Sequence, residues 1–289
     1  MIAGLRELHA RIPRAWAVSG ALVCFLACSA PALAGTGLPT PWQIDFQTPV
    51  TPVMEAIYSF HAFLTILSAA ITVFVMVLLG ICIFRFNERA NPVPSKTTHH
   101  TALEIVWTVI PAIILIVVFV PSLRMLFEQL EIPKSDLTVK ATGTAQWTWT
   151  YTYPDQGGFS FDSNMLQDNE RKPGQPRLLA VDNDMVVPVN KVVRVQVTAE
   201  GIIHAFAMPS FGLKLDAIPG RLNETWFKAT REGIFYGQCS ELCGRNHAFM
   251  PIAIRVVSER EFAVWVEEAK KKFAAAPDPA TVVVAEAAR

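Results

Sequence analysis

Two long apolar stretches dominate the first half of the chain. One covers residues 56–84 and carries no charged side chain, and the other covers 105–123, with Pro111 in its interior. Each can cross the hydrocarbon core of a bilayer as a helix, and a proline is tolerated there when neighbouring groups satisfy the freed carbonyl. Neither stretch shows the amphipathic period of a helix on a soluble core. The pattern therefore predicts a transmembrane helical hairpin over residues 55–124 rather than a buried soluble hairpin.

After the second stretch the pattern changes to short segments rich in β-branched and aromatic residues. Glycine and proline separate them, as at Pro219 and Gly220, which is typical of a small β-sandwich or barrel. Strands are expected at 137–141, 146–153, 185–189, 192–198, 225–229, 233–238 and 252–257. This β-rich domain spans 125–258. Helical spacing at 259–273 predicts a helix on the edge of the barrel, within a C-terminal helix and flexible tail over 259–289.

The first 34 residues have the features of an export signal. Arg6, Arg11 and Arg14 precede an apolar run that ends before the small-residue tripeptide Ala32-Leu33-Ala34. That order predicts cleavage after Ala34, and an uncleaved first membrane anchor is the alternative. Residues 35–54 would then form a short exported segment in front of the hairpin.

The charges between the two stretches predict the orientation of the hairpin. The connector carries Arg85, Arg89 and Lys96, and short basic loops remain in the cytoplasm. Both ends of the hairpin therefore point outward. This places both mature termini and the β-rich domain on the periplasmic side of a bacterial inner membrane.

Composition agrees with a protein of the lipid bilayer and limits its other partners. Apolar residues make up 52% of the 289-residue chain, charged residues make up 17%, and the formal net charge is +0. No nucleic-acid partner is expected, and a charged partner must be recognised by a local patch. Of five cysteines, Cys24 and Cys28 lie in the predicted signal and Cys82 in the first apolar stretch, so only Cys239 and Cys243 belong to the β-rich domain.

Cys239 and Cys243 belong to a dense group of soft metal ligands. His247 and Met250 follow them in one loop, and this set suits copper better than calcium or magnesium. One loop cannot surround a metal, so His204 from an earlier strand is the expected further ligand. A mononuclear blue-copper site needs one cysteine, and the second thiolate indicates two bridged copper ions. The alternatives are a disulfide and a zinc site, around which Met250 would have no role.

Several segments together resemble subunit II of cytochrome c oxidase over nearly the whole chain after Ala34. They are Leu103-Glu104-Ile105-Val106-Trp107-Thr108, Pro121-Ser122-Leu123-Arg124, Gln146-Trp147-Thr148-Trp149, Asp216-Ala217-Ile218-Pro219-Gly220-Arg221 and the cysteine loop. The resemblance implies a two-helix transmembrane hairpin followed by an all-β, cupredoxin-like Greek-key sandwich or barrel.

The resemblance also implies a metal site. A dinuclear copper A centre would be bound by His204, Cys239, Cys243, His247 and Met250. The backbone carbonyl of Glu241 would complete it. The Glu241 side chain would point towards subunit I and help to hold magnesium or manganese, a role that fits a hard carboxylate. A solvated loop carboxylate is the alternative.

Two more residues gain roles from the resemblance. Trp147 is similar to the exposed aromatic through which family members take electrons from cytochrome c, and its alternative is a core tryptophan in a strand. Glu104 corresponds to a glutamate near the entrance of a proton pathway into subunit I, and its alternative is an interfacial anchor. A basic cytochrome would dock on carboxylates near Trp147, with candidates Asp155, Asp162, Asp182 and Glu200.

The function that the resemblance implies is electron entry into a respiratory oxidase. Cytochrome c would reduce the copper pair, and haem in subunit I would receive the electron for oxygen reduction coupled to proton pumping, with subunit III as a further partner. A quinol-oxidase subunit would lack the copper ligands, and nitrous oxide reductase is soluble with a large additional domain. A copper-delivery module would leave the paired tryptophans unexplained. The chain has no Cys-x-x-Cys-His for covalently attached haem.

Overall fold

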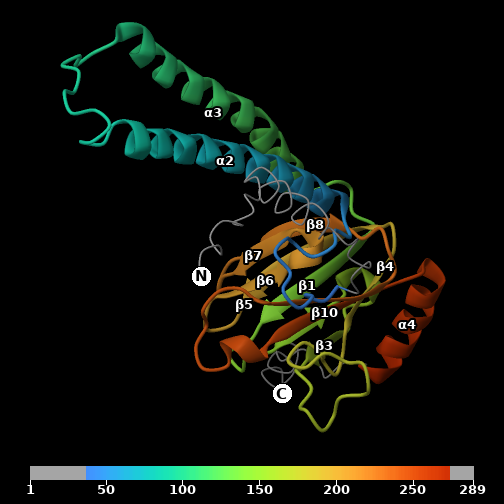
Figure 1. Ribbon diagram of the computed structural model, residues 1–289. Coiled ribbons are helices and arrows are strands. Elements are labelled where there is room, and N and C mark those ends of the chain that lie inside the picture. The colour runs from blue at the N-terminus through green and yellow to red at the C-terminus, as the bar shows by residue number, and fades with distance from the viewer. Residues whose placement is uncertain (1–36, 274–289) are drawn as a thin grey trace, which may run out of the picture. The chain divides into compact units, whose positions relative to one another are not determined.

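The computed structural model describes residues 37–273. The predicted signal, with Cys24 and Cys28, and the predicted tail beyond residue 273 lie outside the described residues. The described part consists of two long helices, ten β-strands in two sheets and a C-terminal helix (Figure 1). The predicted order of a helical hairpin followed by a β-sandwich is therefore confirmed.

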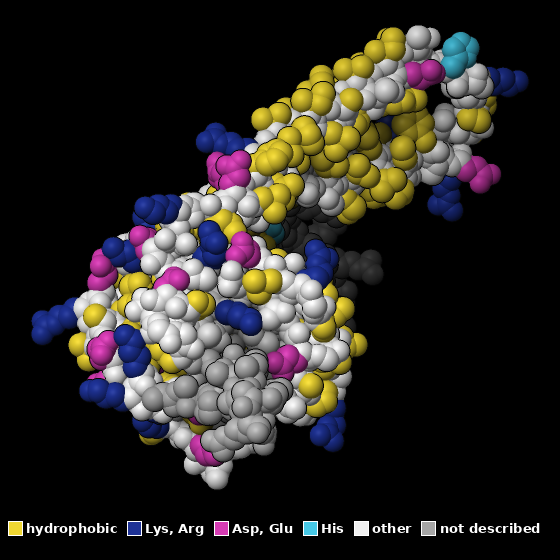
Figure 2. All heavy atoms as spheres, turned by 180° about the vertical axis from the view of Figure 1, so that it is seen from behind, with side chains coloured by type: hydrophobic (Ala, Val, Ile, Leu, Met, Phe, Trp, Pro, Cys, Tyr) yellow, Lys and Arg dark blue, Asp and Glu magenta, His cyan; other side chains and the backbone are white. Residues whose placement is uncertain are grey.

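The two long helices are α2 (Pro52–Arg85) and α3 (Thr101–Leu130). Both are apolar enough to cross a membrane, and the most apolar window of each has no buried residue. Figure 2 shows hydrophobic side chains covering them between charged ends. They have 34 and 30 residues, which at ~1.5 Å per residue exceeds a hydrocarbon core of about 30 Å. The helices therefore either tilt in the membrane or extend their ends into the interfacial regions.

Both helices extend beyond the bounds that hydrophobicity alone predicted. The first begins at Pro52 rather than at residue 55, because the Thr51 side chain caps it by accepting a hydrogen bond from the Met54 N–H. The second continues past residue 124 to Leu130, with Pro111 and Pro121 both inside the helix. Polarity marks where a helix leaves the lipid, whereas capping and chain-breaking residues mark where it ends.

The ten strands form two five-stranded sheets with orders β3-β2-β1-β5-β8 and β4-β10-β9-β6-β7. The first sheet consists of β1 (Leu137–Gly143), β2 (Trp149–Thr152), β3 (Ser160–Ser163), β5 (Val192–Ala199) and β8 (Asn223–Lys228). The second consists of β4 (Met185–Pro188), β6 (His204–Met208), β7 (Leu213–Ala217), β9 (Gly233–Cys239) and β10 (Pro251–Val257). Strands β1 and β5, and strands β4 and β10, pair in parallel.

The sequence pattern gave no bounds for β3, β6 or β7, although His204 was expected to lie on a strand. The β6 segment, His204-Ala205-Phe206-Ala207-Met208, is a short apolar run without alternation, and such runs do not distinguish a buried strand from a helix segment. In contrast, β5 alternates strictly between buried and partly exposed residues, which is the pattern of a strand with one face on the core. Its bounds were accordingly predicted to within a residue.

The core lies between the two sheets and is rich in aromatic residues. Its largest fully buried side chains include Trp149, Tyr151, Tyr153, Phe206 and Phe211. Burying a large apolar side chain stabilises a fold by ~1.5–3 kcal/mol. The sandwich therefore has the apolar area needed to hold a rigid framework at its ends.

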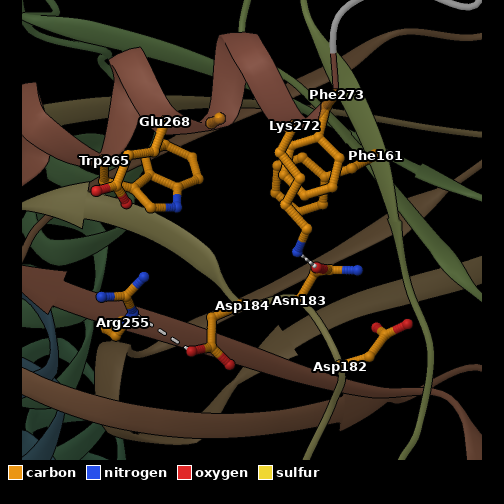
Figure 3. Close-up of a pocket in the computed structure, with 10 residues that line it drawn as sticks. Phe161, Asp182, Asn183, Asp184, Arg255, Trp265, Glu268, Lys272 and Phe273 are labelled. Atoms are coloured by element: carbon orange, nitrogen blue, oxygen red, sulfur yellow. Dashed lines mark hydrogen bonds and ion pairs between the residues drawn. The ribbon is translucent and has the colours of Figure 1, made fainter.

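Helix α4 (Glu259–Lys272) packs against this core, as predicted. It begins with a capping box between Ser258 and Glu261, and the Trp265 ring lies 5.1 Å from that of Tyr153. Beside it lies a pocket of about 290 Å³ (Figure 3). There Arg255 pairs with Asp184 at 3.4 Å, so opposite charges line this pocket beneath the helix.

The segment before α2 is hydrogen-bonded to the sandwich. Val50 N–H donates to the Ser210 carbonyl at 2.9 Å, and its own carbonyl accepts from Thr230 N–H at 2.9 Å. The Thr51 hydroxyl donates to the Phe211 carbonyl at 2.8 Å. The same threonine therefore caps the membrane helix and bonds to the β-domain.

Two buried tyrosines provide a test of the inter-sheet hydrogen bonds. The Tyr153 hydroxyl donates to the Val186 carbonyl at 2.9 Å and accepts from Val186 N–H at 2.8 Å, which links the end of β2 to β4. We expect Tyr153→Phe to lower the free energy of unfolding by about 1–3 kcal/mol, because buried Val186 groups lose their partner. Denaturant unfolding of the solubilised chain, followed by near-ultraviolet circular dichroism, measures this loss.

The matched control is Tyr151→Phe. The Tyr151 hydroxyl is equally buried but has no hydrogen-bond partner among the described residues. Its removal should leave stability unchanged or raise it slightly. Equal losses in the two variants would contradict the assigned role of the Tyr153 hydroxyl.

Candidate metal centre

The predicted ligands come together where β6, β9 and the loop between β9 and β10 meet. His204 is the first residue of β6 and Cys239 the last residue of β9. These two strands are antiparallel neighbours, with Phe206 opposite Cys239, which brings the histidine beside the cysteine. The loop from Ser240 then carries the remaining donors and ends with Met250, directly before β10.

The donor atoms form one continuous cluster. Cys239 Sγ lies 3.8 Å from His204 Nδ1 and 3.8 Å from Cys243 Sγ. Cys243 Sγ lies 3.5 Å from His247 Nδ1 and 3.6 Å from Met250 Sδ. Each sulfur of the cysteine pair therefore has its own imidazole.

The cysteine pair is not a disulfide. A disulfide needs sulfurs about 2.0 Å apart, and both cysteines are free in the structure. The Cys239 thiol instead donates to the Glu241 carbonyl at 3.3 Å, which places that backbone oxygen beside the cluster. The Glu241 side chain is exposed.

Burial favours the ligand form of His204. Its side chain is fully buried, and desolvation lowers its pKa, against the opposing effect of its hydrogen bond to the Thr144 carbonyl. His204 Nε2 lies 3.0 Å from that oxygen, so the neutral ring that donates there leaves Nδ1 as a lone pair facing Cys239. A metal-ligating histidine uses its second ring nitrogen in this way.

Burial has the opposite consequence for the Cys243 thiol. Desolvation and the neighbouring Cys239 raise the pKa of Cys243 to about 12, so in the metal-free chain this thiol keeps its proton at neutral pH. A bound metal reverses that preference, because a coordinating thiol loses its proton. Metal binding at this site must therefore release protons.

The donor set fits copper. His204, Cys239 and Cys243 alone place three ligand atoms within 4.8 Å of one another. A tetrahedral zinc site would be complete with two cysteines and two histidines, which leaves the thioether without a role. Met250 is nevertheless 2% exposed and has its sulfur in the cluster. Two thiolates, two imidazoles and a thioether are the soft ligands that copper prefers.

Trp147 lies beside this cluster, but not in a strand. Residues 144–148 form a tight turn in which Thr144 N–H donates to the Thr148 carbonyl at 3.0 Å, so the strand predicted from residue 146 begins only at Trp149. Trp147 is half-buried rather than openly exposed, and its Nε1 donates to the Cys243 carbonyl at 2.8 Å. The indole thus connects the surface directly to a ligand residue.

A groove of about 410 Å³ opens beside Trp147, with Asn246 and Phe249 of the cysteine loop in its wall. Asp168 lines the same groove and pairs with Arg171 at 3.1 Å and Arg177 at 3.2 Å. The negative charge on this side of Trp147 is therefore already matched by two cations.

The acidic residues predicted for docking are exposed and make local hydrogen bonds, and they differ in their distance from Trp147. Asp155 accepts a hydrogen bond from Thr138 N–H, near the start of β1. The turn with Trp147 follows the other end of that strand, about 17 Å away at ~3.3 Å per residue. Asp162 and Asp182 are engaged by Thr150 and Asn164, respectively.

Glu104 belongs to a different part of the protein. It lies in the first turn of α3 and accepts a hydrogen bond from the His100 N–H at 3.3 Å. A carboxylate in the first turn stabilises a helix through its dipole. Its contacts therefore include a structural one, besides the proton role expected from resemblance.

Fold and donor set together define a class. The chain is a helical-hairpin protein whose β-sandwich presents a soft-metal site of two cysteines, two histidines and a methionine.

Comparison with known families identifies this class further. Residues 137–257 match the family described as cytochrome c oxidase subunit II, periplasmic domain, and residues 39–125 match its transmembrane domain. The chain belongs to the cytochrome c oxidase subunit II family. It is accordingly a membrane protein and a component of an oxidoreductase.

Individual relatives agree. A Rickettsia felis protein named probable cytochrome c oxidase subunit 2 is 51% identical over 256 residues, covering 89% of this chain and 80% of its own. Cytochrome c oxidase subunit 2 of Cereibacter sphaeroides is 47% identical over 252 residues, covering 81% and 82%. The crystal structure of the periplasmic domain of subunit II of cytochrome oxidase from Bradyrhizobium japonicum is 71% identical, with a TM-score of 0.47, and covers 50% of this chain and 99% of that one.

The raised pKa of Cys243 predicts how its reactivity changes with pH. In the metal-free chain the reactive thiolate should increase about tenfold per pH unit from pH 7 to beyond pH 10, because the pKa is about 12. Alkylation with iodoacetamide, followed at Cys243 by peptide mass spectrometry, measures this rate. The denatured chain is the control and should level off near pH 9. A plateau near pH 9 in the folded chain would contradict the burial effect.

Proposed function

We propose that this chain is the electron-entry subunit of a respiratory haem-copper oxidase. It accepts electrons from cytochrome c at a dinuclear copper A centre and passes them to haem in subunit I, where oxygen is reduced to water with proton pumping. The observation that carries this proposal is the pair of free, buried sulfurs 3.8 Å apart. With an imidazole beside each sulfur, the pair suits two metal ions better than one.

The residues of the cluster have distinct roles in this proposal. The bound copper pair supplies a site that takes up and releases one electron. Cys239 and Cys243 would hold it as thiolates, His204 and His247 would be its nitrogen ligands, and the carbonyl of Glu241 and the thioether of Met250 would be weaker donors. Because His204, Cys239, Cys243 and Met250 are buried, these donors need to move little when the charge changes.

We assign electron entry to Trp147. Its half-buried indole reaches the Cys243 carbonyl through one hydrogen bond, which gives an approaching cytochrome c a short path to the ligands. The adjoining groove offers a docking surface, and its paired charges favour a contact governed by shape and apolar area. Glu200, an exposed carboxylate, remains the acidic candidate from the sequence.

The remaining assignments complete the proposal for the assembly. The Glu241 side chain, exposed on the copper loop, is a ligand for magnesium or manganese at the contact with subunit I. Glu104 lies at the entrance of a proton pathway, and subunit III is a further neighbour. Residues 1–34 are an export signal, 35–54 an exported segment, and 125–258 the periplasmic copper domain.

The ligand assignment predicts different results for two substitutions in the purified oxidase. Cys239→Ser should abolish the dinuclear centre, because a hydroxyl does not bridge soft metals, whereas Met250→Leu should retain copper and change the reduction potential. Copper content, electron paramagnetic resonance and a redox titration distinguish these outcomes. A wild-type chain with zinc, or with one copper and no shared unpaired electron, would refute the proposed function.

Electron entry at Trp147 predicts a kinetic defect without metal loss. Trp147→Phe removes the hydrogen bond to the Cys243 carbonyl, and we expect reduction by cytochrome c to slow by about tenfold, which corresponds to ~1.4 kcal/mol in the barrier. Stopped-flow reduction of the whole complex measures the rate. Trp226→Phe, which removes an indole N–H that has no hydrogen-bond partner among the described residues, is the control and should react normally. An unchanged rate in Trp147→Phe would place electron entry elsewhere.

A further inference from the structure

The loop between β1 and β2, residues 143–149, contacts three of the metal-ligand residues but contributes no ligand itself. The Thr144 carbonyl lies 3.0 Å from His204 Nε2. Trp147 Nε1 donates to the Cys243 carbonyl, and Trp149 Nε1 donates to the Met250 carbonyl at 3.3 Å. This loop belongs to the opposite sheet from the strands that carry the ligands.

The loop is itself rigid. Gly143 pairs with Trp149 across the β1–β2 ladder, and the Thr144 and Thr148 hydroxyls lie 2.7 Å apart. Trp147 has a left-handed backbone with φ of 59°, a conformation that persists only where surrounding contacts enforce it. The loop can therefore act as a fixed reference for the groups that it contacts.

Trp149 is the central residue of this arrangement. It is fully buried, its ring meets Phe206 edge-on at 5.5 Å, and it lies 6.0 Å from the ring of His204. One side chain thus touches the Met250 carbonyl and packs beside the histidine ligand from β6.

The fit around His204 leaves no free space. A Cβ added at Gly143 would come within 2.7 Å of His204 Cδ2, so glycine is required for this close approach. The histidine ring is held between Gly143, the Thr144 carbonyl and the Trp149 indole. Its orientation is therefore set largely by the β1–β2 loop.

We propose that Trp149 is a positioning residue for the metal centre, which through its indole N–H and ring holds the Met250 carbonyl and the His204 ring in the geometry that the metal requires. Without this hydrogen bond, the Met250 carbonyl loses its indole partner, and the end of the cysteine loop can shift. Since a weak thioether ligand tunes the reduction potential of copper, a small shift there changes the electron-accepting properties. This part of the inference rests on the proposed function, whereas preorganisation of the cluster does not.

The test compares Trp149→Phe with Trp226→Phe. Both changes remove an indole N–H, but Trp226 Nε1, although buried, has no hydrogen-bond partner among the described residues. In the metal-free full-length chain, alkylation of Cys239 and Cys243 by iodoacetamide is followed by peptide mass spectrometry. We expect roughly three- to tenfold faster alkylation in Trp149→Phe and no change in Trp226→Phe. Equal rates in the two variants would overturn the proposal.

Copper titration provides the second readout. Trp149→Phe should weaken copper binding by about tenfold or more and change the paramagnetic spectrum, while Trp226→Phe should match the wild type. If Trp149→Phe does not fold, Gly143→Ala tests the same loop from the His204 side, and it should also weaken copper binding. Wild-type affinity and spectrum in whichever variant folds would refute the positioning role.

The two proposals fail in different ways. A wild-type chain that binds zinc or a single metal would refute the electron-entry function, yet faster alkylation in metal-free Trp149→Phe would still support the positioning role. A normal copper pair in the wild type, together with equal alkylation rates in Trp149→Phe and Trp226→Phe, would support the electron-entry function and refute the positioning role.

Discussion

The antiparallel pairing of β6 with β9 is the constraint on which the metal site depends. It brings His204, at the start of one strand, beside Cys239, at the end of the other. The burial of His204 makes this contact consequential, because desolvation lowers the pKa of the imidazole and favours its neutral form, which can bind a metal. The fold therefore brings soft donor atoms together where a metal cation can bind them.

Each of the two sheets contributes different residues to the site. The second sheet and its loop supply the candidate ligands, whereas the first sheet supplies the β1–β2 loop that contacts His204, Cys243 and Met250. Aromatic side chains between the sheets, such as Trp149 and Phe206, transmit this alignment because a close-packed core does not deform gradually. A site on one sheet is therefore located by the packing of both.

The membrane helices follow a simpler logic than the β-domain. Lipid offers no hydrogen-bond partner to the backbone, so a single apolar segment that crosses it forms a helix. The hairpin can therefore be predicted from hydrophobicity. The bounds of its helices cannot, because they depend on Thr51 as a cap and on the accommodation of Pro121 inside α3. In the β-domain, β5 was predictable from alternation, whereas β6 has no period by which it could be recognised.

The sequence alone determined the helical hairpin, the β-rich character of the second half and the candidate ligands, because each depends on residue type and spacing. Tertiary structure alone decided which atoms meet. It placed the Thr144 carbonyl against His204 Nε2 and gave the Trp149 indole a hydrogen bond to the Met250 carbonyl. It also placed Trp147 in a turn, with a hydrogen bond to the Cys243 carbonyl, and Asp155 at the far end of β1 from that turn. The contacts of Thr144, Trp147 and Trp149 with the candidate ligand residues join positions 60 or more residues apart, and only the packing of the two sheets brings such positions together.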